Sequence, residues 1–299
     1  MQISEKWAEL LEPGLRSIFE LQRDALAATS QIPALFNVIG SSKAAEYFLS
    51  IGGFGDWTEY KGAIEYQDNE QGHKTTLTHK EYVQGFAVER KLVDDDQYNI
   101  INARPRGLAL AAMRTREKHA ASIFNNAFSS SYTGGDAVAL CSNSHPYSPL
   151  NASVQDNYGT YSLTYDNLVT VRRLMREYKD DKGELVPIMP DVLVVPPELE
   201  ETAYGIKMTA NKPGQTDLQA NFIGSKFQTV VWDYLTDSNA WFVLDSALAR
   251  QHLLWIDRKP LEFAADPTGD YNLVARYRGY MRYSYGWSDW RFLYGNNPS

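Results

Sequence analysis

The chain has 299 residues, of which 43% are hydrophobic and 13% aromatic, and its formal net charge is -8. This composition excludes a mostly disordered chain, and the length allows one large domain or two modest ones. The acidic balance argues against tight wrapping of a nucleic acid, because such binding depends on neutralising phosphates.

Cysteine usage and the N-terminus indicate where the chain is made. Cys141 is the single cysteine, so no intramolecular disulfide can form, which suits a reducing compartment. The N-terminus lacks the basic and apolar regions of a signal peptide, and no apolar run approaches the roughly 20 residues of a membrane helix. We expect synthesis in the cytosol and no contact with a membrane.

The first 45 residues are predicted to form an arm. A short helical pattern over 3–11 is interrupted by Pro13 and Gly14, and the period resumes from Leu15 to Ala28. This opening segment has little to pack against by itself.

A long projecting hairpin is predicted next. Glycines 52, 53 and 55 read as a flexible joint, because they lack the continuation of a phosphate loop. One strand-like run covers Trp57 to Tyr66 and another covers Leu77 to Val88, around the polar tip 67–73. That tip is too polar to bury.

The longest helical signal follows the hairpin. The acidic run 94–96 supplies candidate N-caps, and strong helix formers continue to Phe128. Pro105 fits an early helical position. A helix of about six turns should act as a structural spine.

The middle of the chain reads as a small α/β unit. A loop-like stretch over 129–161 precedes a helix over 164–178. The apolar run 192–195 indicates a strand buried on both faces, and a helix follows through Met208. Further strands are predicted at 230–234, 241–244 and 253–256.

The C-terminal stretch reads as a long aromatic strand followed by a second one. From Tyr271 the odd positions are apolar, aromatic or glycine, while the even positions include Arg276, Arg278 and Arg282. Such alternation indicates one buried face and one polar face. The arginine face is a candidate surface for contacts between subunits.

No catalytic, cofactor-binding or metal-binding residue is predicted. Cys141 and His145 match no nucleophile signature, and an ordinary loop is preferred. The remaining histidines show no metal spacing and are expected to be solvated, and the acidic run 94–96 lacks the spacing of a calcium loop. Five basic residues of the spine are expected to form a solvated or salt-bridging face: Arg104, Arg106, Arg114, Arg116 and Lys118.

The aromatic residues of the C-terminus leave two interpretations. They could stack on sugars or bases, as in a carbohydrate-binding β-rich protein or an enzyme. Packing in a core or interface needs no further assumption and is preferred; the residues concerned are Tyr277, Tyr283, Trp287 and Trp290. Long aromatic elements that cannot bury their surface within one subunit indicate an assembly protein.

From about Ala34 onward, the chain resembles the major head subunit of Mu-like tailed bacteriophages. The resemblance rests on three stretches and two short motifs: 117–128 (EKHAASIFNNAF), 190–197 (PDVLVVPP), 241–244 (WFVL), 285–287 (YGW) and 289–291 (DWR).

The resemblance implies the α+β capsid fold of phage Hong Kong 97, the HK-97 fold. Its parts would be an N-terminal arm (1–45), an E-loop with flanking strands (46–93), a P-domain spine helix (94–135), an A-domain (136–262) and C-terminal P-domain strands (263–299). The terminal strand would return to the P-domain sheet over the spine helix.

The implied function is a non-enzymatic major capsid protein that assembles into the icosahedral shell of a phage head. Its partners would be further copies in pentamers and hexamers, a separate scaffold, a portal, decoration proteins and weakly contacted DNA. The location would be the virion, after assembly in the host cytoplasm. Some members cross-link through a lysine, but nothing marks Lys61, Lys74 or Lys80 as reactive.

Overall fold

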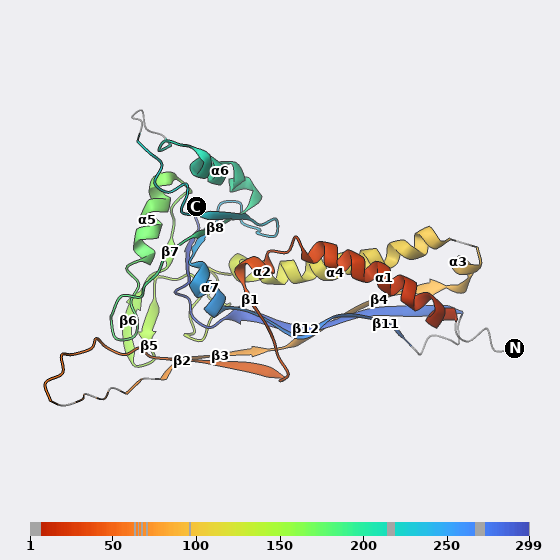
Figure 1. Cartoon of the computed structure of the whole chain (residues 1–299), viewed down its shortest axis with the longest axis horizontal. Helices are drawn as coiled ribbons and strands as arrows, with labels where there is room; N and C mark the ends of the chain where they lie inside the picture. Colours follow the sequence, from red (N-terminus) through yellow and green to blue (C-terminus); the bar gives the residue numbers. More distant parts are fainter. Residues whose placement is uncertain are drawn as a thin grey trace.

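The computed structural model describes residues 7–62, 64, 66, 68–69, 71–95, 97–213, 219–266 and 273–298. The molecule has an elongated body and an α/β unit that stands at one end of it, with the hairpin of β2 (Ala45–Ile51) and β3 (Gln71–Thr78) below (Figure 1). The first and last described elements lie in different parts, since the helix Trp7–Ala27 lies on the body and the strand Leu293–Asn296 lies in the α/β unit.

A four-stranded sheet with strand order β1-β11-β12-β4 forms the elongated body. The strands are β1 (Asn37–Gly40), β4 (Lys80–Glu89), β11 (Leu253–Asp266) and β12 (Val274–Trp287). β12 pairs antiparallel with both β11 and β4, whereas β1 pairs parallel with β11. The two 14-residue strands β11 and β12 give the body its length.

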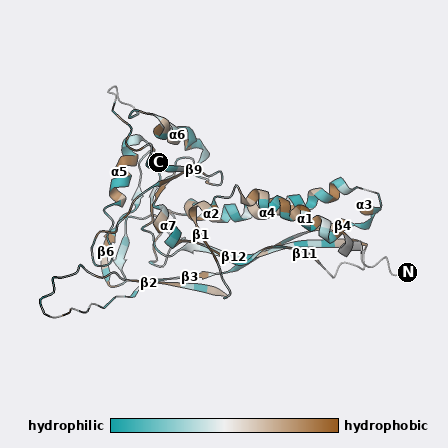
Figure 2. Ribbon diagram, viewed as in Figure 1, coloured by the Kyte–Doolittle hydropathy of each residue, from teal (hydrophilic) through white to brown (hydrophobic). Residues whose placement is uncertain are grey.

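Two helices cover one face of this sheet (Figure 1), the spine α4 (Tyr98–Asn125) and α1 (Trp7–Ala27). Hydrophobic and hydrophilic segments alternate along both helices (Figure 2), as expected for helices with one face on a core. Buried residues recur along α4 at helical spacing: Ile101, Pro105, Leu108, Ala109, Ala112, Ala120, Ala121, Ile123 and Phe124. The predicted spine is therefore confirmed, with shorter ends.

The alternation predicted for the terminal strand is confirmed from Ala275 to Tyr283, but it fails at the ends, where Leu273 is exposed and Ser284 is buried. Ala275, Tyr277 and Tyr283 are buried toward the helices, while Arg276 and Arg278 are exposed. The strand lies inside the sheet, between β11 and β4, and Tyr283 contacts the spine through a 2.8 Å hydrogen bond with His119 of α4. Tyr271 lies outside the described residues.

The α/β unit contains a five-stranded sheet with order β7-β13-β10-β8-β9. The strands are β7 (Tyr158–Gly159), β8 (Val192–Val195), β9 (Gln228–Val231), β10 (Trp241–Leu244) and β13 (Leu293–Asn296). Each residue of β8 and β10 is buried, which confirms the buried strand predicted at 192–195 and the strand predicted at 241–244. The strand predicted at 230–234 is shifted, because β9 ends at Val231. The helices of this unit are α5 (Tyr165–Met175), a short 3-10 turn (Pro197–Leu199) and α6 (Glu200–Met208), and α7 (Ser246–His252) precedes β11.

The hydrophobic core is continuous between the two units. Phe124 of the spine lies edge-on to Trp232 and to Phe242, with ring centroids 5.5 Å and 5.2 Å apart. Phe128 stacks on Phe242 at 5.6 Å. The end of the spine is thus inserted into the α/β unit.

The N-terminal segment differs from the predicted arm, because it forms one continuous helix and packs on the body. α1 is continuous from Trp7 to Ala27 with Pro13 inside it, so the predicted interruption is wrong. Loss of one hydrogen bond at Pro13 is outweighed by packing, because Leu15 and Phe19 are buried and Phe19 contacts Phe263 at 5.1 Å. A short helix, α2 (Ile32–Leu35), then leads into β1.

In the N-terminal half of the chain, the predicted bounds of strands and helices also differ from the structure. The predicted strand over 57–66 is wrong where it is described; the hairpin instead consists of β2 (Ala45–Ile51) and β3 (Gln71–Thr78). The acidic run does not cap the spine, since Asp94 ends a short helix, α3 (Arg90–Asp94), and Gln97 precedes α4 without a side-chain cap. Pro105 lies in the interior of α4.

Strand boundaries in the second half differ as well. The predicted loop 129–161 contains β7 and a small hairpin, β5 (His145–Ser148) with β6 (Asn151–Gln155). β11 continues well beyond Ile256 and lies in the elongated sheet, whereas β13 lies in the sheet of the α/β unit. The division between the two sheets therefore does not follow the expected boundary at residue 263.

Replacing Phe124 with Ala should destabilise the unassembled chain by about 3–5 kcal/mol, because the ring fills the junction between the two units. Urea unfolding followed by circular dichroism measures the change. Leu110→Ala is the matched control, since Leu110 is 47% exposed on the same helix and should cost less than about 1 kcal/mol. Equal losses for both variants would contradict the proposed junction.

Candidate functional site

The β2–β3 hairpin and its 52–70 connection present an unusual apolar surface. On β2, Tyr47, Leu49 and Ile51 are exposed on one face. Five more large apolar side chains are exposed on the connection: Phe54, Trp57, Tyr60, Ile64 and Tyr66. Because clustered exposed apolar side chains mark contact with a partner, we call these eight residues the hairpin surface and treat it as the candidate functional site.

The hairpin is not part of either large sheet. β2 pairs with β3 in a separate two-stranded sheet. A two-stranded hairpin is marginally stable alone in water. The hairpin therefore depends on the body on one face, and it leaves the other available.

The turn that follows α5 in the α/β unit supports the start of the connection with a specific contact. The backbone N–H of Gly53 donates to Oδ1 of Asp181 at 2.8 Å. A Cβ atom at this position would lie 2.8 Å from an Asp180 carboxylate oxygen, so a larger residue would force that carboxylate to move. Gly53 is thus an attachment point, although the sequence indicated a flexible joint there.

Polar groups also order the segment through which the chain enters β2. Ser41 donates to Glu46 at 2.7 Å and Lys43 pairs with the same carboxylate at 3.0 Å. The hydrogen bond from Ser41, followed by that from Lys43, lowers the pKa of Glu46. Glu46, the second residue of β2, therefore stays ionised at neutral pH.

A cavity of about 210 Å³ lies between the hairpin and the C-terminal turn. Its walls include Ile51, Gly53 and His73 from the hairpin, and Trp287 and Trp290 from the body. Among the described residues, no group of three or more His, Cys, Asp or Glu side chains could hold a metal ion. The cavity therefore lies between the hairpin and the rest of the chain, and ionisable side chains such as His252 and Asp289 also line it.

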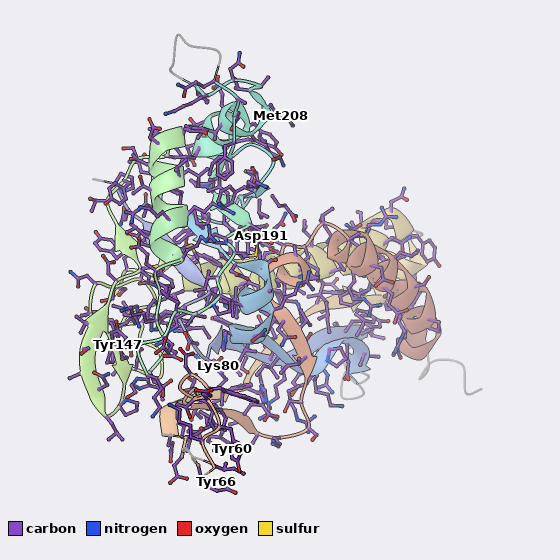
Figure 3. All side chains as sticks on the ribbon, turned by 60° about the vertical axis from the view of Figure 1, so that its left-hand side comes forward. Tyr60, Tyr66, Lys80, Tyr147, Asp191 and Met208 are labelled. Atoms are coloured by element: carbon purple, nitrogen blue, oxygen red, sulfur yellow. The ribbon has the colours of Figure 1, made fainter. Side chains whose placement is uncertain are left out.

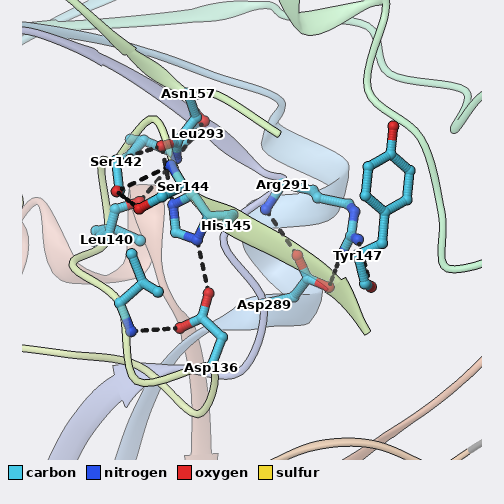
Figure 4. Close-up of polar contacts among 11 residues, drawn as sticks. Asp136, Leu140, Ser142, Ser144, His145, Tyr147, Asn157, Asp289, Arg291 and Leu293 are labelled. Carbon is cyan, nitrogen blue, oxygen red and sulfur yellow. Dashed lines mark hydrogen bonds and ion pairs between the residues drawn. The ribbon is translucent and has the colours of Figure 1, made fainter. Parts of the chain in front are cut away.

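A buried polar cluster lies behind this cavity (Figure 4). Nδ1 of His145 lies 2.6 Å from Oδ2 of Asp136, and Nε2 lies 3.1 Å from Oδ1 of Asn157. The Asn157 amide donates to the carbonyl of Leu140 at 2.8 Å, which fixes its orientation. The His145 ring stacks on Trp290 with centroids 4.3 Å apart. Both ring nitrogens are engaged, so His145 is placed to hold the structure together.

Cys141 is close in sequence to this cluster and is buried. Burial raises the pKa of the Cys141 thiol well above its ordinary value. A nucleophilic cysteine needs the opposite shift and a free base. The geometry thus gives no support to a catalytic Cys141–His145 pair.

The expectation that the other histidines are solvated is wrong. His79 is buried, and its Nδ1 lies 2.9 Å from Oγ of Ser284. His119 contacts Tyr283, and Nδ1 of His252 lies 3.0 Å from Oγ of Ser288. His73 is only partly exposed. No sequence spacing identified these partners, because each lies on a distant strand or turn.

The C-terminal aromatic residues pack in the core, as preferred from the sequence. Tyr277, Tyr283, Trp287 and Trp290 are all at least 95% buried. They cannot form a stacking platform for sugars or bases. This removes the residues on which the ligand-binding alternative rested.

The basic face expected on the spine is not uniformly solvated. The guanidinium of Arg116 donates to both carboxylate oxygens of Asp257, at 2.9 Å and 3.0 Å. Arg104 donates to the carbonyl of Ala87. Arg114 and Lys118 remain exposed, as predicted.

A second set of exposed apolar residues lies at the opposite end of the molecule. Tyr204 and Met208 on α6 and Phe222 in the following loop are exposed. Figure 3 shows Met208 at one extremity and Tyr60 and Tyr66 at the other. Among the described residues, no helix combines the length and apolar character needed to cross a membrane.

Comparison with a family model places most of the chain in one group. The model described as phage capsid protein matches residues 74–296. The search of curated proteins finds no match.

Three solved structures share the arrangement of elements at low sequence identity. The capsid protein in the decorated capsid of bacteriophage JBD30 has a TM-score of 0.57 and 15% identity, over 69% of this chain and 91% of that chain. A chain of Microbacterium phage Oxtober96 has a TM-score of 0.54 and 14% identity, over 90% and 91%. A virus-like particle from Pyrococcus furiosus has a TM-score of 0.56 and 9% identity, over 95% and 98%. At these identities the likeness establishes the fold.

Cys141 should not react with a thiol reagent in the folded chain, because its side chain is buried and its pKa is raised. Titration with an aromatic disulfide reagent should give almost no colour until urea unfolds the protein. A Thr76→Cys variant carries an exposed thiol and is the positive control. Rapid reaction of the native chain would contradict the assigned burial.

Proposed function

The chain belongs to the phage capsid protein family and has the HK-97 fold, and on this basis we propose that many copies of it form the icosahedral shell of a tailed bacteriophage head. It is a structural protein of the virion. The elongated sheet with its spine corresponds to the P-domain, the α/β unit to the A-domain and the β2–β3 hairpin to the E-loop.

The apolar hairpin surface is the observation that carries the proposal. A single subunit leaves Trp57 98% exposed and Tyr66 90% exposed, which is costly in water at about 25 cal/mol per Å² of apolar surface. A neighbouring copy that covers these side chains recovers this free energy. Small contacts repeated over many copies then hold the shell by avidity.

The contact is assigned to the hairpin and not to the N-terminal helix. Leu15 and Phe19 of α1 are buried against the subunit's own sheet and spine. Releasing α1 to reach a neighbour would expose this core. α1 therefore works as a second layer of the P-domain.

The exposed end of the α/β unit suits a position at the centre of each pentamer or hexamer. There, Tyr204, Met208 and Phe222 of neighbouring copies would approach one another. This arrangement leaves the hairpin at the opposite extremity free to overlap an adjacent subunit (Figure 3).

Further partners are proposed from the requirements of a phage head. A separate scaffold protein would set the shell's size, a portal would occupy one vertex, and decoration proteins would bind outside. The net charge of -8 suits a shell that encloses DNA and contacts it weakly. The Mu-like subtype and assembly in the host cytoplasm belong to the same proposal.

Electron microscopy of the purified chain should reveal closed shells, rings or other large oligomers. Sedimentation should agree, because the hairpin surface drives association. A well-behaved monomer under all conditions, including co-expression with the scaffold of the same phage, would contradict the proposal.

The double variant Trp57→Ser, Tyr60→Ser should fold normally and lose most of its assembly. Both side chains are exposed, so their removal costs little stability, but it removes apolar contact area. Light scattering measures assembly and thermal melting measures folding.

Leu150→Ser is the matched control, since Leu150 is 78% exposed in the β5–β6 turn, outside the hairpin. This variant should assemble like the parent chain. Equal loss of assembly in both variants would show that the hairpin surface has no special role.

A further inference from the structure

One exposed aromatic ring of the α/β unit lies among cations. Phe222, in the loop after α6, is 56% exposed. The guanidinium of Arg172 on α5 and the ammonium of Lys226 each lie over its ring, 5.8 Å from the centroid. Burial lowers the pKa of Arg172, and the charge of Arg176 lowers it further, so the two guanidinium groups are close enough to repel each other. We call Arg172, Arg176, Phe222 and Lys226 the basic cluster.

The basic cluster has no counterion in the part of the chain that the structure describes. Two acidic side chains of α5 and the turn after it are paired elsewhere, since Asp166 binds Lys212 at 2.7 Å and Glu177 binds Arg173. No described carboxylate lies within ion-pair distance of the three cations. Because like charges repel and an exposed ring leaves apolar surface in water, this arrangement favours a partner that carries negative charge.

An acidic edge lies at the start of α6 in the same unit. It consists of Glu198, Glu200 and Glu201, which are all exposed. The positive end of the helix dipole favours acids in a first turn, so local stability explains part of this pattern. Within the described residues, however, these carboxylates form no ion pair, and their charge is available to a partner.

The two charged surfaces lie on different sides of the unit. α5 is on the side away from the elongated body, whereas α6 is on the side nearer to it (Figure 1). The acidic edge and the basic cluster therefore do not neutralise each other within one subunit. A second copy related by rotation can bring the unlike surfaces together, and such a heterologous contact closes a ring when the rotation closes.

We propose that the basic cluster of one subunit binds the acidic edge of the next copy around each pentamer or hexamer. The inference rests on the capsid function proposed above and adds the chemistry of the contact between neighbouring α/β units. The same contact would cover Phe222 and remove its apolar surface from water. Packaged DNA is the other polyanion that such a cluster could attract, but the matching acidic edge on the same unit favours a second copy.

Ion pairs of this kind orient a contact more than they strengthen it. Each exposed pair contributes little by itself, because water and salt screen the charges. Complementary surfaces instead speed correct association and reject contacts between like charges. The effect of the contact should therefore appear in the rate of assembly at low salt.

Charge exchange in the full-length chain tests the contact. Arg176→Glu with Lys226→Glu reverses the cluster, and Glu198→Lys with Glu201→Lys reverses the edge. Each double variant should slow assembly about tenfold in light scattering at low salt, because like charges then face each other. The quadruple variant restores unlike charges and should recover the parent rate. All four positions are exposed, and thermal melting checks that each variant folds.

Lys179→Glu with Arg250→Glu is the matched control. Both residues are exposed cations outside the cluster, and their reversal changes the net charge by the same amount as reversal of the cluster. This variant should assemble like the parent chain. An equal loss would show that net charge alone decides the rate, and it would overturn the proposal.

Parent-like assembly of both double variants, or a quadruple variant that does not recover, would also overturn it. Binding of a short DNA duplex, followed by fluorescence anisotropy, tests the other polyanion. If reversal of the cluster abolishes DNA binding and leaves assembly unchanged, the cluster belongs to nucleic acid and the proposal is wrong. Shells formed by the parent and by every variant would refute this contact alone, whereas a parent chain that stays monomeric would refute the capsid function.

Discussion

The ion pair between Arg116 and Asp257 fixes the spine on the sheet, and the rest of the structure depends on that position. The guanidinium binds the carboxylate through two hydrogen bonds and lies over the rings of Trp255 and Tyr283, 4.9 Å and 5.4 Å from their centroids. The paired charges are largely shielded, so breaking one partner would leave an uncompensated charge. The planar fork of arginine permits one orientation, which sets the register of α4 against β11.

Glu117, the residue after Arg116, connects the spine to the α/β unit. Glu117 accepts a 3.0 Å hydrogen bond from the Trp232 indole and another from Ser30, in the link between α1 and α2. One turn of α4 thereby orients the N-terminal helix, the elongated sheet and the α/β unit. Aromatic packing around Phe124 then completes the junction. A rigid body of this kind can carry a hairpin whose apolar surface faces outward, because folding does not depend on that surface.

The candidate site is a hairpin that hydrogen bonds anchor and whose large apolar side chains are exposed. Hydrogen bonds at Gly53 and in the 41–44 connection anchor the hairpin. The eight large apolar side chains of the hairpin surface remain exposed. The body meanwhile buries the groups that could have been mistaken for a reactive centre, such as His145 and Cys141. The candidate site is therefore exposed apolar area on an anchored hairpin, which suits a contact that is repeated over many copies.

The sequence alone determined the periodic elements: the spine, the fully buried strand β8 and the alternation of β12, because each is encoded by the spacing of apolar residues. It also predicted a projecting hairpin, but with its first strand at 57–66 and a polar tip at 67–73, whereas β2 ends at Ile51 and β3 begins at Gln71. Only the tertiary structure decided which strands pair, that α1 packs on the body despite Pro13, that β13 leaves the elongated sheet, and that His79 is a buried connection. These features depend on contacts between residues far apart in the chain, such as His79 with Ser284, and local spacing carries no information about such partners.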